Sequence, residues 1–362
     1  MGSSGKSLRA DVGSLFIVGL EGVELTGLER NWLRLVGPSG VILFRRNIEN
    51  AGQTRALLDA ATAECAPRAF RCVDVEGGTV NRLRDTLAPI AAAQEVAATG
   101  VKKLMRRHGE LIADAARAFG FNTSFAPVLD LALPDAWAVM TTRTPAATPG
   151  GVAEYGREVL AGMRKRGVLG CGKHYPGLGG GMVDSHLETP VIGRGWKALW
   201  AEDLAPYREL RGEMPFVMVN HAAYPRTKDK KRPASASPFW TDVLRKKIKY
   251  KGIILSDDLE MGGILKFLPI EEAAVEVFRA GMDMALVCHK AELVIAAYEA
   301  VLSEAERSAV FRRIITSRAK FVAHERARLV RKPAKALSAS EYKALRGRIL
   351  AFNEDVAKGR QA

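Results

Sequence analysis

Short apolar runs recur along the chain, and a longer stretch separates each run from the next. Inside the runs, hydrophobic residues follow one another without alternating with polar ones, which is typical of parallel strands covered on both faces. Eight runs of this kind predict eight strands: Leu15–Leu20, Val41–Phe44, Phe70–Val75, Thr123–Leu129, Val168–Gly172, Phe216–Asn220, Gly252–Leu255 and Met284–Val287.

The stretches between the runs have helical spacing. They include Gln53–Cys65, Val101–Phe119, Gly151–Arg166, Trp196–Glu213, Trp240–Lys247 and Ile270–Gly281. Eight strand–helix repeats in one chain predict an α/β fold, a (β/α)8 TIM-type barrel.

Polar residues gather where the predicted strands end. In a closed barrel these ends converge on one face, where active sites lie. An open doubly wound sheet would place ligands near a single switch point. Polar groups at nearly every strand end therefore favour closure; they are Asp74, Glu76, Asp130, Lys173, His174, His221, Asp257, Asp258, Cys288 and His289.

The remainder of the chain, residues 290–362, has a helical pattern with a basic end. Pro333 separates a last helical segment, Ala339–Val356, which we expect to pack on the outside of the barrel. We therefore predict one barrel domain over residues 1–325, and a basic helical extension over residues 326–362 that packs on the barrel or trails from it.

Composition changes this interpretation little. The chain has 362 residues, 48% of them hydrophobic, and a formal net charge of +14 at pH 7. Much of the charge lies in residues 226–251 and after Arg326. A basic surface can attract acidic substrates or nucleic acid. No helix-turn-helix, zinc-finger or RNA-binding motif accompanies the charge, so we interpret it as solvated surface and expect no nucleic-acid partner.

Targeting and redox signals favour the cytoplasm. The chain has no run of 18 apolar residues, and its first 20 residues lack the apolar core and cleavage site of a secretory signal. We expect a monomer that does not bind a membrane. The four cysteines have neither disulfide-type nor metal-type spacing, which predicts reduced and mostly buried thiols; they are Cys65, Cys72, Cys171 and Cys288. We expect no metal and no cofactor.

The segment Lys173–Pro190, KHYPGLGGGMVDSHLETP, is the strongest indication of chemistry. Glycines at 177, 179, 180 and 181 predict a loop that can move. Asp184 and His186 on that loop form a plausible carboxylate–imidazole pair. Core packing requires neither a mobile loop nor an ionisable pair on it.

The sequence SDDLEM, Ser256–Met261, follows the seventh predicted strand. A hard metal would want more carboxylates than this pair. Neighbouring strand residues point to opposite sides, so we expect only one of Asp257 and Asp258 to face the pocket. We expect Asp257 to be a catalytic carboxylate, and Asp258 can instead cap the next helix.

Three further groups of polar residues suit a sugar site. Asp74 can accept hydroxyls, Gly77-Gly78 allow a tight turn, and Arg82 can reach back as a donor. Lys173-His174 offer fixed donors at a strand end. The glycine turn could also be purely structural, His174 could be a satisfied core residue, and Arg143 taken alone is typical of a surface.

Together these motifs resemble glycoside hydrolase family 3, in the branch of cytosolic β-N-acetylglucosaminidases that recycle cell-wall fragments. The resemblance covers most of residues 10–320. Its order and spacing make coincidence a poor explanation, and its motifs are GVILFRRN (Gly40–Asn47), DVEGG (Asp74–Gly78), PVLDL (Pro127–Leu131), Arg143, KHYPG (Lys173–Gly177), DSH (Asp184–His186), NH-x-x-YP (Asn220–Pro225) and SDDLEM.

The resemblance implies roles for individual residues. Asp257 is the expected nucleophile, and His186, polarised by Asp184, is the expected acid/base. The residues implied to hold the N-acetylglucosamine ring are Asp74, Arg82, Arg143, Lys173 and His174. A retaining glycosidase needs a carboxylate at the oxocarbenium-like centre and a proton donor for the leaving oxygen. An imidazole beside a carboxylate can donate that proton near neutral pH.

One motif departs from the branch. Its loop often reads Gly-His-Gly-Asp-Thr, whereas Leu178, Gly180 and Gly181 occupy the His, Asp and Thr positions here. The expected catalytic pair is kept, but the way this loop docks and closes is open to change.

The expected activity is removal of terminal β-linked N-acetylglucosamine, from peptidoglycan-derived muropeptides such as 1,6-anhydro-muramoyl peptides. A phosphorylase with the same dyad is an alternative, because a neutral histidine repels phosphate less than a carboxylate would. A non-catalytic sugar-binding barrel is an alternative of another class. A family 3 β-glucosidase fits less well, since those enzymes generally place their acid/base in a second domain.

Overall fold

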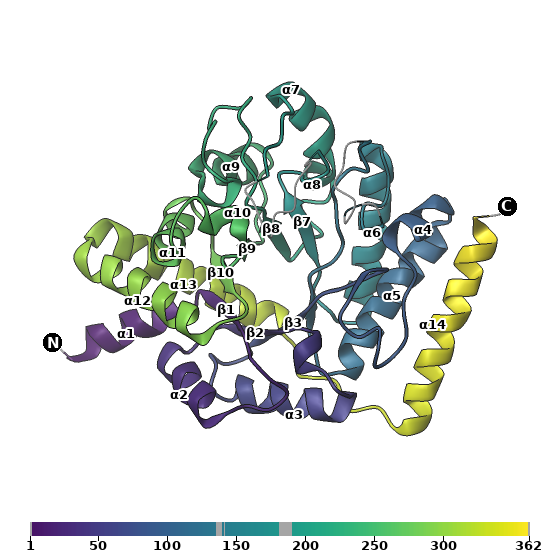
Figure 1. The fold of residues 1–362 in the computed structure, drawn as a ribbon, viewed down its shortest axis with the longest axis horizontal. Helices are drawn as coiled ribbons and strands as arrows, with labels where there is room; N and C mark the ends of the chain where they lie inside the picture. Colours follow the sequence, from purple (N-terminus) through teal and green to yellow (C-terminus); the bar gives the residue numbers. More distant parts are fainter. Residues whose placement is uncertain (1, 135–139, 141, 181–189, 361–362) are drawn as a thin grey trace.

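Eight parallel strands form the centre of the computed structural model, which describes residues 2–134, 140, 142–180 and 190–360, with side chains from residue 8 onward. The strands follow the order β6-β3-β2-β1-β10-β9-β8-β7 (Figure 1). They are β1 (Phe16–Gly19), β2 (Gly40–Leu43), β3 (Phe70–Val73), β6 (Thr123–Ser124), β7 (Cys171–Tyr175), β8 (Phe216–Val219), β9 (Ile253–Asp258) and β10 (Met284–Val287).

Short bridges between the two end strands close the sheet into a barrel. Thr123 pairs with Leu169 and Val128 pairs with Lys173, both in parallel. The Cys171 N–H also donates to the Ala126 carbonyl at 2.7 Å. The predicted (β/α)8 barrel is confirmed, and each predicted apolar run overlaps one of its strands.

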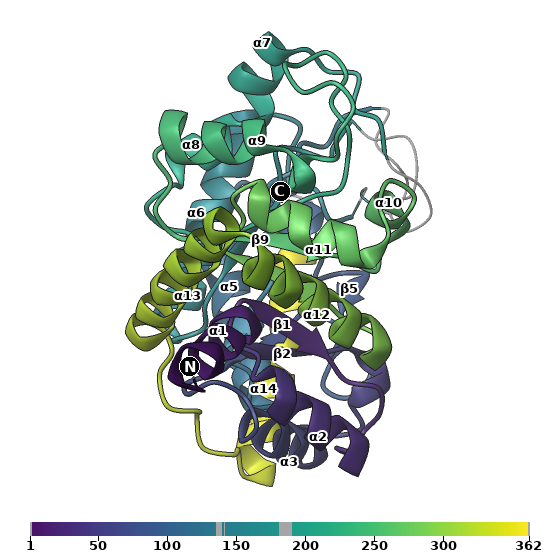
Figure 2. The ribbon, with the colours of Figure 1, turned by 90° about the vertical axis from the view of Figure 1, so that its left-hand side faces the viewer.

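Helices surround the strands (Figures 1 and 2). Those of eight or more residues are α1 (Gly2–Gly13), α2 (Gly27–Val36), α3 (Ala51–Thr62), α5 (Lys102–Ala118), α6 (Pro149–Lys165), α11 (Ile270–Arg279), α12 (Ala291–Arg307), α13 (Ala309–Leu329) and α14 (Ala339–Gly359). Shorter ones are α4 (Ala93–Ala98), α7 (Trp196–Ala198), α8 (Ala205–Glu209), α9 (Pro238–Asp242) and α10 (Gly262–Leu265). None of the helices in these described ranges has the length and apolar character needed to cross a bilayer.

Two expected helices are interrupted. The segment Trp196–Glu213 forms α7, a π-helical stretch (Leu199–Asp203) and α8, which ends at Glu209. Pro206 near the start of α8 has no N–H to continue the preceding helix. Trp240–Lys247 likewise divides between α9 and a π-helical stretch, Val243–Lys247.

Aromatic rings pack together below the cavity, with Phe70 and Phe216 at the start of β3 and β8 and Phe125 directly after β6. Phe216 contacts Phe70 edge-to-face at 5.0 Å and Phe125 at 6.5 Å, and all three are buried. This apolar layer forms the floor beneath the polar strand ends. All four cysteines are free thiols, and three of them are buried, namely Cys72, Cys171 and Cys288.

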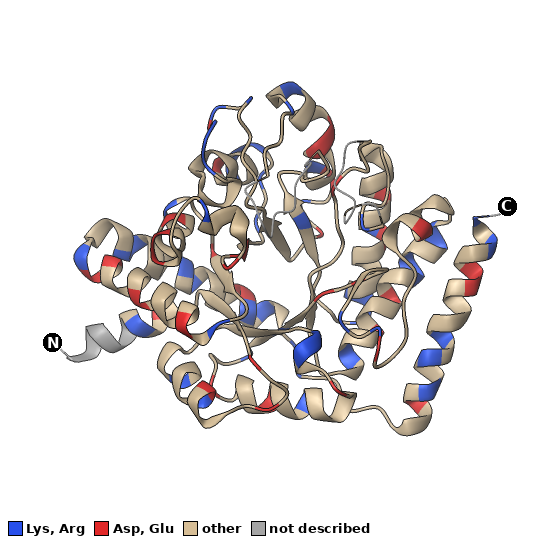
Figure 3. Cartoon of the chain, viewed as in Figure 1, with Lys and Arg blue, Asp and Glu red and all other residues tan. Residues whose placement is uncertain are grey.

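The charged residues lie mainly on the outer helices. In Figure 3, Lys and Arg alternate with Asp and Glu along these helices. The last helix, α14, lies along α4 and α5 (Figure 1).

Helices α5 and α6 pack unusually closely because glycines face the contact. A Cβ at Gly109 would lie 2.1 Å from the Val159 carbonyl oxygen, and one at Gly162 would lie 2.3 Å from that of Arg106. Neither backbone can move to make room for a side chain unless the two helices separate.

We expect Gly109→Ala to lower the free energy of unfolding by about 3 kcal/mol, because the methyl group overpacks a backbone contact. Gly150→Ala in α6 is the matched control, since nothing lies within 4 Å of its Cβ position. That variant should be neutral or about 0.5–1 kcal/mol more stable, because alanine favours a helix. Urea denaturation measures both, and equal stabilities would contradict the close crossing.

Candidate active site

A cavity of about 410 Å³ opens at the C-terminal ends of the barrel strands. Its walls are mixed, with apolar side chains between charged ones. The predicted site residues among its lining are Asp74, Arg82, Arg143, Lys173, His174 and Asp257. The structure therefore brings together six residues that the sequence spreads over 184 positions. Asp184 and His186, the expected acid/base pair, lie outside the described residues.

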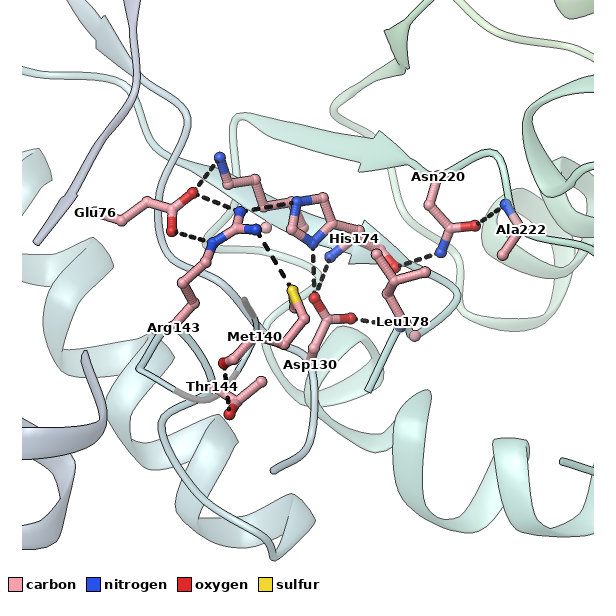
Figure 4. A network of polar contacts seen from close by, with 12 residues as sticks. Glu76, Asp130, Met140, Arg143, Thr144, His174, Leu178, Asn220 and Ala222 are labelled. Atoms are coloured by element: carbon pink, nitrogen blue, oxygen red, sulfur yellow. Dashed lines mark hydrogen bonds and ion pairs between the residues drawn. The ribbon is translucent and has the colours of Figure 1, made fainter. Parts of the chain in front are cut away.

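A buried charge cluster forms one wall of the cavity. The Lys173 Nζ lies 2.9 Å from Asp74 Oδ1 and 2.6 Å from Glu76 Oε1. Arg143 donates two hydrogen bonds to the Glu76 carboxylate, at 2.8 and 2.9 Å (Figure 4). The Glu76 and Lys173 side chains are only 3% and 4% exposed. Such pairing is required because an unpaired charge at this depth costs several kcal/mol.

Mutual attraction fixes the charges of this cluster. Burial disfavours ionisation of Glu76, but the positive charges of Arg143 and Lys173 outweigh it and hold the pKa of its carboxyl well below the usual range. Burial likewise acts against ionised Asp74, yet Lys173 and Arg82 lower the pKa of its carboxyl. Burial works to lower the pKa of Lys173, while Asp74 and Glu76 raise it overall. The cluster therefore stays fully ionised near neutral pH.

His174 is held in one orientation by Asp130. The His174 Nδ1 lies 2.7 Å from Asp130 Oδ2, and Nε2 lies 3.3 Å from the Arg143 Nη2 (Figure 4). A guanidinium can only donate, so Nε2 accepts and the ring proton is on Nδ1, where it donates to Asp130. Asp130 Oδ1 accepts from the Leu178 N–H at 2.6 Å. One carboxylate thus ties β7 to the loop that follows it.

Asp257 and Asp258 end β9, and both line the cavity, where we expected only one. Asp258 is engaged with the backbone: its Oδ1 accepts from the N–H groups of Glu260 and Cys288 at 3.1 and 3.2 Å. It does not cap a helix, because α10 begins after Met261. Asp257 forms no ion pair with a described residue, and its Oδ1 accepts only the Asp258 N–H among them.

The residues around Asp257 stiffen its strand end. His221 is buried, with Nδ1 2.7 Å from Ser235 Oγ and Nε2 3.0 Å from the Asp258 carbonyl oxygen. Burial lowers the pKa of the His221 imidazole, so the ring is neutral. Neutral His221 donates to this carbonyl from Nε2 and accepts from Ser235.

Arg82 reaches back to the cavity as expected. Its Nη2 lies 3.6 Å from Asp74 Oδ2, and its Nε is buried with no partner among the described residues. The guanidinium also lies over the Phe44 ring, 5.5 Å from the centroid. The side chain is 30% exposed, so it retains a free donor at the mouth of the cavity.

Gly77 and Gly78 form a turn that carries Glu76 into the cluster. Both have positive φ, +95° and +60°, in the hairpin of β4 (Val75–Gly77) and β5 (Val80–Asn81). A side chain at either position would be strained and would meet neighbouring atoms. The expected tight turn is present, and here it supports the site.

The loop after β7 is closely packed where it begins. Gly177 has φ +127°, and its Cβ would lie 2.8 Å from Asp203; a Cβ at Gly179 would lie 2.1 Å from the Leu131 carbonyl oxygen. Residues 177–179 are buried. Glycine is therefore needed at both positions because neighbouring atoms leave no room for a side chain. The sequence alone suggests mobility as the reason for these glycines. Leu178 between them lines the cavity.

Glu76 and Asp130 carry more of the site than the sequence suggested. The sequence places both at strand ends and in the motifs DVEGG and PVLDL without indicating a role for either, yet Glu76 joins Arg143 to Lys173, and Asp130 orients His174. Their position at strand ends was the available signal. Arg143, typical of a surface in isolation, has a side chain only 11% exposed. In the described part of the chain, no three His, Cys, Asp or Glu residues form a metal-binding group.

We expect Glu76→Gln to lower the free energy of unfolding by about 3 kcal/mol at pH 7, because Arg143 and Lys173 lose their shared counter-charge. Folding lowers the pKa of Glu76, so its contribution is complete above the unfolded value of 4.5. The contribution then decreases progressively as the pH falls from 4.5 toward the much lower folded pKa. Urea denaturation from pH 7 to pH 3 should show that the gap in unfolding free energy between this variant and the wild type becomes smaller. Exposed Glu49→Gln should change stability by under about 0.5 kcal/mol. A gap as wide at pH 3 as at pH 7 would contradict this account.

Comparison with known proteins agrees with this geometry. The model of the Glycosyl hydrolase family 3 N terminal domain matches residues 7–322. A β-hexosaminidase of Alkalilimnicola ehrlichii is 38% identical over 286 residues, which are 77% of this chain and 81% of that protein. A β-hexosaminidase of Neisseria meningitidis is 38% identical over 72% of this chain and 74% of its own length.

Solved structures are similar over nearly the whole chain. NagZ from Neisseria gonorrhoeae, in complex with N-trifluoroacetyl-D-glucosamine, has a TM-score of 0.77 and 30% identity, covering 96% of this chain and 98% of that one. A family 3 β-N-acetylglucosaminidase from Paenibacillus has a TM-score of 0.85 and 30% identity, covering 95% of this chain and 68% of that one. The chain therefore belongs to glycosyl hydrolase family 3, and it is a β-N-acetylhexosaminidase.

Proposed function

We propose that this enzyme is a retaining glycosidase in which Asp257 is the nucleophile. The observation that carries the proposal is how Asp257 differs from the other carboxylates of the cavity in its contacts. Asp74 and Glu76 are neutralised by cations, and Asp258 is occupied by backbone amides, whereas Asp257 has no ion pair with a described residue. A carboxylate that no described cation neutralises can attack a carbon that gains positive charge.

The charge cluster is the proposed site for the sugar ring. Asp74 offers acceptor oxygens for hydroxyls, while Arg82, Arg143 and Lys173 offer donors. His174 presents an oriented imidazole between them. Because these groups are already paired and oriented, they need little reorganisation when the ring binds. From the family, we infer that the acetamido group is the feature that selects the substrate. The similar Neisseria gonorrhoeae enzyme, which binds an N-acylated glucosamine, supports this inference.

Asp184 and His186 are the proposed acid/base pair. Asp257 attacks the anomeric carbon, the bond from this carbon to the leaving oxygen breaks, and protonated His186 gives that oxygen its proton. The sugar is then held as an ester of Asp257. Neutral His186 next takes a proton from water, whose oxygen attacks the same carbon and releases Asp257.

The proposed substrates are muropeptide fragments that end in β-linked N-acetylglucosamine. Support comes from the resemblance to the cell-wall recycling branch and from charge. The chain carries a net charge of +14, and Arg82 presents a partly exposed guanidinium at the cavity. Lactyl and peptide carboxylates on the leaving group would be attracted to such a surface.

Asp257→Ala should reduce the hydrolysis of p-nitrophenyl N-acetyl-β-glucosaminide by at least about 1,000-fold, because no ester can form. His186→Ala should reduce it severely as well. Asp242→Asn, on an exposed carboxylate of α9 paired with Lys246, should retain full activity and serves as the control. A slow fluorosugar substrate should label a peptide that contains Asp257. A label on any other residue, or full activity in the Asp257 variant, would contradict the assignment.

An anhydro-muramoyl tripeptide that carries N-acetylglucosamine should be hydrolysed with a kcat/KM at least about tenfold above that of neutral chitobiose, because charge attraction adds about 1.4 kcal/mol. Raising the salt concentration should reduce this advantage. Competition kinetics in one tube measure the ratio directly. Equal values at low salt would contradict a muropeptide preference. Product analysis in phosphate buffer should yield free N-acetylglucosamine.

A further inference from the structure

Helix α14 lies beyond the part of the chain that the family model matches, which ends at residue 322. It packs along α4 and α5 through a buried stripe formed by Leu345, Ile349, Phe352 and Val356 (Figure 1). This stripe explains why the helix is held on the barrel. It does not explain the polar residues that α14 directs at one particular segment, residues 86–91.

Asn353 binds the backbone of this segment with both ends of its amide. Its Oδ1 accepts from the Ala91 N–H at 2.9 Å, and its Nδ2 donates to the Pro89 carbonyl at 2.9 Å. About three helical turns before Asn353, the Tyr342 hydroxyl donates to the Thr86 carbonyl at 2.7 Å. These bonds fix the path of a stretch of chain that contains no helix or strand of its own.

The stretch held by Asn353 is the support of the glycine turn. The Gly78 N–H donates to the Ile90 carbonyl at 2.8 Å, between the two residues that Asn353 binds. Gly77 lies so close that a Cβ there would be 2.3 Å from the Ala91 carbonyl oxygen. A shift of residues 89–91 must therefore move the turn, because no free space separates them.

A second contact runs from α14 to the same turn. The Phe352 ring stacks on His108, with centroids 5.7 Å apart and planes at 14°, and a Cβ at Gly77 would lie 2.8 Å from the His108 Nε2. Burial lowers the pKa of His108 to about 3, so the ring is neutral and adds no charge beside Glu76. The turn is thus supported on two sides by groups that α14 contacts, although His108 itself lies on α5 and is also bonded by the Tyr155 hydroxyl at 3.0 Å.

Glu76 is the residue next to this turn, and it joins Arg143 to Lys173 in the sugar site. We propose that α14 is a positioning element of the active site, and that Asn353 is a positioning residue that sets Glu76, and through it Arg143 and Lys173, by holding residues 89–91. The proposal rests on the proposed function, in which Arg143 and Lys173 bind the sugar ring. Asn353 itself touches no substrate.

Asn353→Ala tests the proposal, with Arg348→Ala as the matched control. Arg348 also lies on α14, but it binds Asp114 of α5 at 2.5 Å and not the segment 86–91. On p-nitrophenyl N-acetyl-β-glucosaminide, Asn353→Ala should raise KM about fivefold or more with little change in kcat, because a loosened sugar site weakens ground-state and transition-state binding alike. Arg348→Ala should leave KM unchanged. Asn353→Asp keeps an acceptor for the Ala91 N–H but repels the Pro89 carbonyl. Its KM should lie between that of the wild type and that of Asn353→Ala.

Amide hydrogen exchange supplies a readout that does not depend on activity. The Gly78 amide is not bonded to Asn353, so faster exchange there reports movement passed on through Ile90. We expect Asn353→Ala to speed Gly78 exchange about tenfold, and Arg348→Ala to leave it unchanged. Unchanged Gly78 exchange with unchanged KM, or the same change in both variants, would overturn the proposal. Faster Gly78 exchange in an enzyme without turnover on this substrate would support the positioning role and overturn the proposed function.

Discussion

The pairing of four buried charges is the constraint on which this active site depends. Asp74 follows β3, Glu76 lies in β4, Lys173 lies in β7, and Arg143 comes from the segment before α6. None of them could be buried alone, because an isolated charge in an apolar interior costs far more than one interaction returns. The barrel must therefore close before the cluster is stable, and the cluster in turn fixes three separate segments at the mouth of the barrel.

Much of the fold could be predicted because parallel barrel strands leave a strong pattern. β1 and β10 are apolar throughout, since helices cover one face and the barrel interior the other. The candidate site was accessible for a related reason. Closure brings all strand ends together, so Lys173 and Asp257 could be placed in one cavity without knowing any distance between them.

Pairing across the barrel could not be predicted. Nothing near Arg143 in the sequence indicates burial, and its partner Glu76 lies 67 positions away. Local patterns also fail where packing supplies the stability. Helix α1 contains three glycines and three serines, yet Leu8 and Val12 anchor it in the core against α12 and α13. The π-helical stretch in Leu199–Asp203 is likewise a property of the folded chain.

The packing of the loop after β7 separates what its sequence can vary from what it cannot. A side chain at 177 or 179 would collide with Asp203 or with the backbone of Leu131, whereas a Cβ at 180 would meet the side chains of Arg194 and Ile192 at 3.2 Å or more. The departures from the family motif fall at 178, 180 and 181, and the glycines at 177 and 179 remain. Of these positions, Leu178 lines the cavity, so a different residue there changes a chemical group in the site and leaves the backbone route into the loop the same. Such positions let an enzyme diverge in chemistry without being redesigned in shape.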